Sequence, residues 1–276
     1  MRFFCYLLIL GSVLFATTPN YFDNLIASEN TIGVTSVGHS YFLTHRHNNK
    51  VVLLIHGYTS NPEETRNIGN YLYSQGFDVF GIRMAGHGTK PEDLKTTTWQ
   101  QWYSSVSDAY SELRSRYTKV YLFGVSMGAV AALKIAEETT PNGVVCAGAF
   151  LMPTSPLISF GHFIYPVSRI FGSDSIYFDA PIPKERQHIT YIRNPLTSTM
   201  QLIDFQNNVP SSLSRISAPI LLMQCSKDNV ASPKSSQLIY GQVKASKKQL
   251  VWEGKEHSFL IDVDKKLYKQ IAVWYR

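Results

Sequence analysis

The sequence predicts an α/β fold in which a mostly parallel central sheet carries helices on both faces. Apolar runs of strand length alternate with segments of helical periodicity along most of the chain. The apolar runs are continuous, which is typical of strands that are buried on both faces of a sheet. The 276 residues, of which 44% are hydrophobic and 17% charged, are enough for one large domain of this kind.

The first half of the chain begins this rhythm with SYFLTHRHNNKVVLLIHGYT, which reads as a strand, a turn and a second strand over residues 51–55. NPEETRNIGNYLYSQG then predicts a helix, with Asn61 as its cap, Pro62 in its first turn and Gly76 at its exit. Glu63 and Glu64 suit the positive end of that helix. FDVFGIR predicts a strand. TTTWQQWYSSVSDAYSELRSRY predicts an amphipathic helix with apolar residues at helical spacing: Trp99, Trp102, Val106 and Tyr110.

In the second half the alternation of predicted strands and helices is interrupted. KVYLFGVSMGAVAALKIA predicts a strand, a tight turn and a helix, and GVVCAGAF predicts another buried strand. Residues 153–214 are instead rich in aromatic residues, proline and serine, before APILLMQCSKD, SPKSSQLIYGQV, KQLVWEGKEHSF and DKKLYKQIAVWYR restore the pattern. We therefore expect one domain over residues 35–276 with an insertion at about 153–214, which leaves and re-enters the sheet at the same edge and covers it as a cap.

The N-terminus, MRFFCYLLILGSVLFATTPN, has one arginine before an apolar run over residues 3–16. This is the layout of a signal peptide, and the run is short for a full membrane span of roughly twenty residues. We expect residues 1–16 to be a signal peptide or a membrane anchor, with a buried N-terminal helix as the alternative. The protein is then exported, to the periplasm or the medium, or anchored, rather than cytoplasmic.

The charge pattern argues against nucleic acid as a partner. The net charge is +6, but no run of lysine and arginine is longer than two, whereas nucleic-acid binders usually cluster their basic residues. A weak attraction to anionic membrane surfaces stays open, so peripheral or anchored membrane contact is kept as an expectation. Cys146 and Cys225 are expected to be buried small hydrophobes rather than a disulfide. His45 and His47 would share one face of a strand without a third ligand, so no metal site is expected.

A serine between two glycines stands where the chain changes from strand to helix. Gly124, Ser126 and Gly128 form the Gly-x-Ser-x-Gly pattern of a nucleophile elbow, in which glycines allow a sharp turn and the serine is exposed at the top of the sheet. The helix that follows would stabilise negative charge near the serine. The alternative, a glycine turn that cradles a phosphate, lacks both the middle glycine of a dinucleotide fingerprint and the Gly-Lys-Ser/Thr of a P-loop.

The serine needs a base to accept its proton, and the later loops offer one. Asp228 and His257 each follow a predicted strand, at the carboxyl edge where the serine should also lie. Their order along the chain, serine, acid and histidine, matches a known arrangement of the catalytic triad. His257 is the only histidine beyond Asp228. Asp204 also follows the serine, but it lies within an apolar run of the insertion and is the poorer candidate for the acid.

An acyl-transfer site also needs two preorganised N–H donors for the oxyanion. The backbone of Met127, directly after the serine, should supply one of them. The loop HGYTS should supply the other from the backbone of Tyr58, because Gly57 permits close approach. The Tyr58 ring is expected to line the acyl site, or else to be a simple wall. Further substrate contacts are expected from aromatic residues of the insertion: Phe160, Phe163 and Tyr165, with Phe171, Tyr177 and Phe178 adding apolar surface.

Five segments carry a resemblance to a known family: LLIHGYTSNPEETRNIGNYLYSQGFDVFGIRMAGHG, WQQWYSSVSDAY, VYLFGVSMGAVAALKIA, ISAPILLMQCSKDNVASP and EHSFLIDVD. They resemble the bacterial carboxylesterase and monoacylglycerol lipase group of α/β hydrolases, from about residue 51 to the C-terminus and weakly through 153–187. The resemblance implies hydrolysis of carboxylic esters of short- to medium-chain acids through an acyl-enzyme, without a cofactor. It places the nucleophile, acid and base at Ser126, Asp228 and His257, and the oxyanion donors at Tyr58 and Met127.

Two departures from that family and several rival functions remain. Glu256 stands where the family usually has glycine, and Met127-Gly128-Ala129 stands where it often has Leu-Gly-Gly. Lysophospholipases, thioesterases, peptidases and C–C bond hydrolases use the same machinery, and a catalytically silent binding protein would share the fold. An epoxide hydrolase or dehalogenase would need aspartate at the position of Ser126. His87, in a Gly-His-Gly that resembles a family loop near the site, is expected to be structural.

Overall fold

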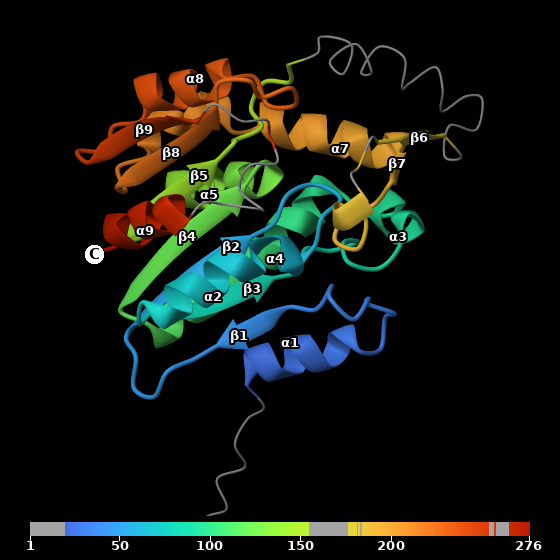
Figure 1. Cartoon of the computed structure of the whole chain (residues 1–276), viewed down its shortest axis with the longest axis horizontal. Helices are drawn as coiled ribbons and strands as arrows, with labels where there is room; N and C mark the ends of the chain where they lie inside the picture. The colour runs from blue at the N-terminus through green and yellow to red at the C-terminus, as the bar shows by residue number, and fades with distance from the viewer. Residues whose placement is uncertain (1–19, 155–175, 181, 183, 254–256, 258–264) are drawn as a thin grey trace, which may run out of the picture.

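The computed structural model describes residues 20–154, 176–180, 182, 184–253, 257 and 265–276, and its architecture is drawn in Figure 1. Among these residues the main sheet has seven strands in the order β1-β3-β2-β4-β5-β8-β9. Only β1 runs antiparallel to its neighbour. The predicted α/β fold with a mostly parallel sheet is therefore confirmed. The strands are β1 Tyr41–Leu43, β2 Lys50–Ile55, β3 Asp78–Ile82, β4 Lys119–Val125, β5 Gly143–Ala147, β8 Ile220–Cys225 and β9 Lys248–Glu253.

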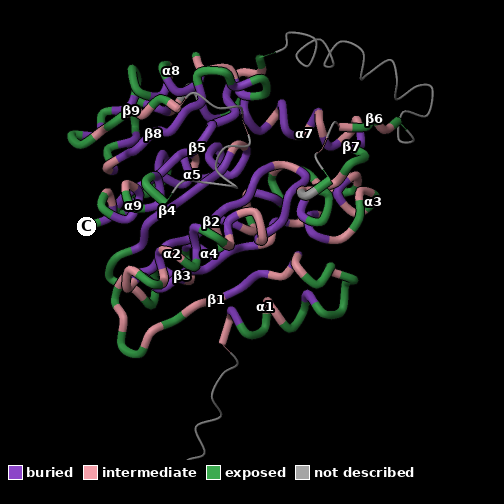
Figure 2. Tube along the Cα trace, in the orientation of Figure 1, coloured by how far each residue is buried: buried purple, intermediate pink, exposed green. Residues whose placement is uncertain are grey.

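Helices cover both faces because every central strand sends alternate side chains into two separate cores. Along β2, Val51, Leu53 and Ile55 belong to one core, and Val52 and Leu54 to the other. The buried strands between the two helical layers can be followed in Figure 2. The first core includes residues of α1 Tyr21–Glu29, α3 Pro91–Lys95, α4 Trp99–Arg116, α5 Met127–Glu138, α7 Leu196–Asn207 and α8 Lys234–Gln242. The second includes residues of α2 Arg66–Ser74 and α9 Lys265–Trp274.

Two predicted helices begin as their sequences indicate. The Asn61 side chain accepts a hydrogen bond from the Glu63 N–H at 3.0 Å, and Pro62 stands in the first turn. That first turn is a 3₁₀ helix, η1 Pro62–Thr65, which continues into α2. The helix α4 starts with a capping box between Thr98 and Gln101. Its predicted apolar face is buried, except that Trp99 is half-buried and stacks on the Phe205 ring of α7.

The prediction that His45 and His47 share a strand face is wrong. The strand β1 ends at Leu43, and both histidines follow in the turn before β2. There the His45 backbone N–H donates to the Asp78 carboxylate at 2.8 Å instead of to a backbone carbonyl of a neighbouring strand. Within the described part of the chain no group of three His, Cys, Asp or Glu residues could hold a metal ion. Cys146 and Cys225 are buried thiols rather than a disulfide, as predicted.

The helix α1 was not foreseen, because its sequence follows the leader as a polar stretch. Asn20 caps it by accepting the Phe22 N–H, and the Phe22 ring is fully buried against Phe42 and Phe80, with ring centroids 4.7 and 4.6 Å away. The predicted leader, residues 1–16, lies outside the described residues. Of the helices that are described, none combines the length and the apolar character needed to cross a bilayer.

The insertion lies outside the main sheet, since β5 pairs directly with β8. Its described residues between 176 and 215, called the cap below, contain β6 Tyr177–Asp179, η3 Lys184–Arg186, β7 Arg193–Pro195, α7 and η4 Pro210–Arg215. The strands β6 and β7 form their own antiparallel hairpin, and α7 packs against α3, α4 and α5 (Figure 1). Tyr177 packs under the Arg193 guanidinium, and Phe178 is 43% exposed. Four residues expected near the substrate, and one near the base, lie outside the described residues: Phe160, Phe163, Tyr165, Phe171 and Glu256.

Candidate active site

The turn at Ser126 has the strand-turn-helix form that the sequence predicts. The backbone of Ser126 has φ 53° and ψ −112°, between the end of β4 and the start of α5. A Cβ added to Gly124 would lie 2.2 Å from the Gly128 carbonyl oxygen, and one added to Gly128 would lie 2.2 Å from the Ile55 carbonyl oxygen. Only glycine fits at both positions. A positive φ at a non-glycine residue costs about 1–3 kcal/mol, and the bond from the Ser126 N–H to the Ala147 carbonyl at 2.8 Å helps to hold it.

Three side chains from distant loops meet at this turn. His257 Nε2 lies 3.0 Å from Ser126 Oγ, and His257 Nδ1 lies 2.8 Å from Asp228 Oδ2. A carboxylate can only accept, so Nδ1 carries the ring proton and Nε2 is free to accept the hydroxyl proton of Ser126. The Asp228 side chain is fully buried and that of His257 is 18% exposed. The structure therefore brings together the three residues that the sequence selected, in an orientation suited to proton transfer.

The carboxylate of Asp228 is held on both oxygens. Its Oδ1 accepts the backbone N–H groups of Val230 at 2.9 Å and Ala231 at 2.8 Å. Its Oδ2 accepts the Gln224 side-chain amide at 3.0 Å in addition to His257. Gln224 is itself buried and fixed by Ser236, whose hydroxyl donates to Gln224 Oε1 at 2.8 Å. Gln224 was missed, although a single amide in the apolar strand APILLMQC is a visible signal.

Asp204, the poorer candidate for the acid, lies elsewhere. It belongs to α7 in the cap, where its backbone carbonyl accepts a hydrogen bond from the Asn208 amide. The carboxylate on His257 Nδ1 is that of Asp228, so Asp204 is not the residue that orients the imidazole.

His56 fixes the peptide that joins Gly57 to Tyr58. His56 Nε2 accepts the Met84 N–H at 3.2 Å, so Nδ1 carries the proton and donates to the Gly57 carbonyl at 2.8 Å. Complete burial lowers the pKa of His56 well below its ordinary value, and the ring stays neutral. The Gly57 carbonyl and the Tyr58 N–H belong to one planar trans peptide and point in opposite directions. Drawing the carbonyl toward His56 therefore turns the Tyr58 N–H to the other side.

The same peptide lies next to the serine. A Cβ added to Gly57 would lie 3.5 Å from Ser126 Cβ. Met127 directly follows Ser126 and is the first residue of α5, so its backbone N–H has no acceptor within the helix. Both predicted donors therefore belong to segments that adjoin Ser126, and their role stays a prediction.

The Tyr58 side chain is tied to the cap. Its hydroxyl lies 2.8 Å from Ser198 Oγ and 3.1 Å from Thr199 Oγ1, both in the first turn of α7. Its ring centroid lies 5.9 Å from that of Trp102, and burial raises the pKa of the phenol to about 12. The side chain connects the loop after β2 with α7. Whether the ring lines the acyl site or is a simple wall stays a prediction.

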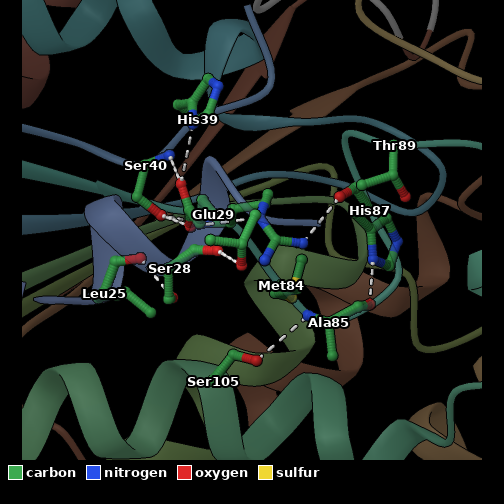
Figure 3. A network of polar contacts seen from close by, with 12 residues as sticks. Leu25, Ser28, Glu29, His39, Ser40, Met84, Ala85, His87, Thr89 and Ser105 are labelled. Carbon is green, nitrogen blue, oxygen red and sulfur yellow. Dashed lines mark hydrogen bonds and ion pairs between the residues drawn. The ribbon is translucent and has the colours of Figure 1, made fainter. Parts of the chain in front are cut away.

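A buried polar network supports the loop that contains His87 (Figure 3). His87 Nδ1 donates to the Ala85 carbonyl at 3.0 Å, and Arg83 donates to the His87 carbonyl at 3.1 Å. Arg83 Nε also lies 3.2 Å from the fully buried carboxylate of Glu29, at the end of α1. The same carboxylate accepts the backbone N–H and the hydroxyl of Ser40, each at 2.7 Å. The His87 ring packs against that of His56, with centroids 5.0 Å apart, so α1 supports the candidate site indirectly.

His87→Asn is expected to reduce the loss of stability in acid. Burial lowers the pKa of His87 from 6.5 to about 4, so the unfolded chain binds a proton that the folded chain refuses as the pH falls through this range. Asparagine keeps a donor for the Ala85 carbonyl and does not titrate. Urea titrations at about pH 7 and about pH 4.5 should show the variant losing about 2 kcal/mol less unfolding free energy than the parent.

The exposed histidine of the cap supplies the matched control for this experiment. His188→Asn should lose as much stability on acidification as the parent protein. Equal losses of unfolding free energy in His87→Asn and the parent would contradict the lowered pKa of His87. They would show that the folded protein binds this proton as readily as the unfolded chain does.

The chain is similar in sequence to a known family and to several characterised enzymes. The model of the family Hydrolase_4, described as serine aminopeptidase S33, matches residues 46–264. A carboxylesterase of Bacillus subtilis (strain 168) is 28% identical over 233 residues, which cover 82% of this chain and 92% of that protein. A thermostable monoacylglycerol lipase of Bacillus sp. (strain H-257) is 29% identical over 208 residues, covering 72% of this chain and 79% of the lipase.

Solved structures agree on the fold. A structure from the work on LipS and LipT, two metagenome-derived lipolytic enzymes, superposes with a TM-score of 0.78 at 23% identity, covering 88% of this chain and 99% of that chain. The monoacylglycerol lipase of Paleococcus ferrophilus superposes with a TM-score of 0.69 at 16% identity, covering 86% and 97%. At these identities the likeness concerns the fold alone.

Proposed function

The chain belongs to the α/β-hydrolase family Hydrolase_4, among esterase- and lipase-like hydrolases, and on this premise we propose that it hydrolyses carboxylic esters of short- to medium-chain acids with Ser126 as nucleophile. The observation that carries the proposal is the hydrogen-bonded series Ser126, His257 and Asp228. The serine alone would be a weak nucleophile. With the His257 imidazole oriented by Asp228 and 3.0 Å from its hydroxyl, it has a base to accept the proton.

The first half of the reaction forms an acyl-enzyme. Ser126 Oγ attacks the ester carbonyl carbon while its proton passes to His257 Nε2. The new imidazolium is stabilised by Asp228, which stays ionised. The negative charge on the former carbonyl oxygen is stabilised by the backbone N–H groups of Met127 and Tyr58, with the N-terminus of α5 adding its dipole. Collapse of this intermediate breaks the ester C–O bond, and His257 returns the proton to the leaving alkoxide.

The second half releases the acid. A water molecule takes the place of the alcohol, gives its proton to His257 and attacks the acyl carbon. The same two N–H groups stabilise the second oxyanion, and the proton returns to Ser126 Oγ as the acid departs. The two halves place the same demands on the site, so each of these groups acts twice in one turnover.

The relatives and the composition of the insertion support the proposed substrate class. The matching proteins from the two Bacillus strains are a carboxylesterase and a monoacylglycerol lipase, which supports an uncharged ester of a fatty acid as substrate. The insertion is rich in aromatic residues, and burying an acyl chain against such surface contributes about 0.8 kcal/mol per methylene. A preference for medium chains over acetyl is the consequence that we propose.

A panel of substrates tests this proposal. For p-nitrophenyl esters, kcat/KM should rise several-fold from acetyl to hexanoyl or octanoyl and then fall, and a medium-chain monoacylglycerol should be hydrolysed as well. The panel includes an aminoacyl p-nitroanilide, because the family description names an aminopeptidase. A profile that peaks at acetyl would contradict the acyl-pocket proposal, and turnover of the anilide in place of the esters would favour the peptidase.

A further inference from the structure

We propose that Glu64 is a positioning residue for the oxyanion hole: by accepting the Gly57 N–H it keeps the Gly57–Tyr58 peptide in place beside Ser126. Arg186 of the cap holds Glu64 in turn. This proposal rests on the proposed ester hydrolysis and adds to it a residue outside the triad and its two N–H donors. It makes the geometry of the oxyanion hole depend on the docking of the cap.

The carboxyl group of Glu64 lies directly behind the loop that follows β2. Its Oε2 accepts the Gly57 backbone N–H at 2.6 Å, and its side chain is only 7% exposed. A Cβ added to Gly57 would lie 3.3 Å from Glu64 Oε2 and 3.5 Å from Ser126 Cβ. Gly57 is therefore the one residue that lies between the Glu64 carboxyl group and the nucleophile. Glu64 also interacts electrostatically with His257.

The bond from the Gly57 N–H to Glu64 fixes the peptide that precedes the donor peptide. His56 and the Ser60 N–H, at 2.8 and 3.3 Å, hold the carbonyl end of Gly57, and Glu64 holds its N–H end. These contacts at both ends restrict the φ and ψ angles of Gly57, although glycine is the residue that would otherwise have the most freedom. The orientation of the Tyr58 N–H follows from those two angles. Loss of the Glu64 contact would allow Gly57 to rotate and would change the orientation of the Tyr58 N–H.

The cap reaches the same loop at several points. Arg186 Nη2 lies 3.7 Å from Glu64 Oε1. The Tyr191 N–H donates to the Thr59 carbonyl at 3.0 Å, and the hydroxyls of Thr59 and Thr190 lie 2.9 Å apart. Thr59 has a φ of 61°, a costly conformation for a β-branched residue, and these two contacts help to hold it. The segment of the cap around residues 186–191 therefore supports the loop through three separate contacts.

A contribution to stability alone does not explain why a carboxyl group is buried at this position. Burial raises the pKa of Glu64, and the Gly57 N–H and the Arg186 guanidinium only partly offset that effect. Burying a carboxyl group costs free energy, and a buried ion pair can often be replaced by apolar side chains without loss of stability. What an apolar side chain could not do is accept the Gly57 N–H.

Two conservative changes separate the effect of side-chain length from the effect of charge. Glu64→Asp keeps the carboxyl group but shortens the side chain by one methylene, so it should lose the contact with Gly57. Glu64→Gln keeps an oxygen at the right distance and removes the charge. We expect Glu64→Asp to lower kcat by roughly 10- to 100-fold, the size of effect that follows a misplaced oxyanion donor, with little change in KM. Glu64→Gln should retain most of kcat.

The second readout is inhibition by a trifluoromethyl ketone, which forms a tetrahedral adduct whose oxyanion occupies the hole. Its Ki should rise for Glu64→Asp by the same factor by which kcat/KM falls. Arg186→Met should lower kcat as well, and the double variant with Glu64→Asp should fall no further than Glu64→Asp alone. The matched control is Glu63→Asp, at a half-exposed neighbour that pairs with Arg66, and it should leave kcat and Ki unchanged.

The outcomes are distinct. A Glu64→Asp variant that is folded by circular dichroism and retains kcat within about twofold, or one with reduced kcat and an unchanged Ki, overturns the role of Glu64. A greater loss in Glu64→Gln than in Glu64→Asp overturns it too, because charge would then matter more than reach. If the losses of kcat from Arg186→Met and Glu64→Asp multiply in the double variant, the two residues act independently and the link to Arg186 is overturned. If the parent protein hydrolyses no ester, the proposed function fails, and this inference fails with it.

Discussion

Ser126→Ala is expected to lower kcat for ester hydrolysis by about 10⁶-fold, with the protein still folded. The change removes only the hydroxyl, which contacts His257 Nε2 at 3.0 Å and stands at a turn whose backbone is fixed by neighbouring glycines. Alanine tolerates the positive φ of this position about as well as serine does, so the melting temperature should change little. Steady-state assays with a p-nitrophenyl ester and circular dichroism provide both readouts.

Comparison with His257→Ala shows whether the residues act as one unit. Each single variant should lose a similar large factor, and the double variant should lose little more, because the second residue has no function without the first. Ser115→Ala, at an exposed serine of α4, is the control for the loss of a hydroxyl and should leave activity unchanged. Losses that multiply in the double variant would contradict a shared mechanism.

Asp228→Asn is expected to lower kcat by about 10⁴-fold, because it reverses the tautomer of His257. Two backbone N–H groups, of Val230 and Ala231, donate to Oδ1, so the amide of the variant must keep its oxygen on that side. Its NH₂ group then faces His257 Nδ1, which has to become an acceptor. The proton moves to Nε2, where it blocks acceptance of the Ser126 proton. The measurement is kcat at a pH where the parent is fully active.

Asp204→Asn is the control for this prediction, since Asp204 is the other carboxylate that sequence reasoning considered. It lies on α7 and should retain parental activity within a small factor. A large loss in Asp204→Asn together with a small one in Asp228→Asn would show that the acid has been assigned incorrectly.

The order of strands and helices could be predicted because its signals are local. Periodicity, Asn61 and Pro62 at a helix start, and two glycines around a serine are each visible within a few residues. The members of the triad could also be selected, because parallel strands all deliver their following loops to one edge. The limit appears already at His45, whose backbone N–H donates to a distant carboxylate, that of Asp78, where the pattern indicated a strand.

The support of the site could not be predicted, because it depends on pairs that are remote in the sequence. Glu64 reads as a residue that complements a helix N-terminus, and only the fold shows that it is buried against Gly57 and Arg186. Glu29 lies in a segment that gave no periodic signal, yet its carboxylate is buried beside Arg83. A buried charge is explained by its partner, and no spacing rule identifies partners more than fifty residues apart.

The central claim, that Ser126 is the nucleophile of an acyl-transfer site, is tested most directly by covalent labelling. The protein is treated with a fluorophosphonate, digested, and examined by mass spectrometry for the modified peptide. One adduct on Ser126 is expected in the parent protein, with slow labelling in His257→Ala and none in Ser126→Ala. An adduct on a different residue, or a parent protein that hydrolyses esters while Ser126 stays unlabelled, would contradict it.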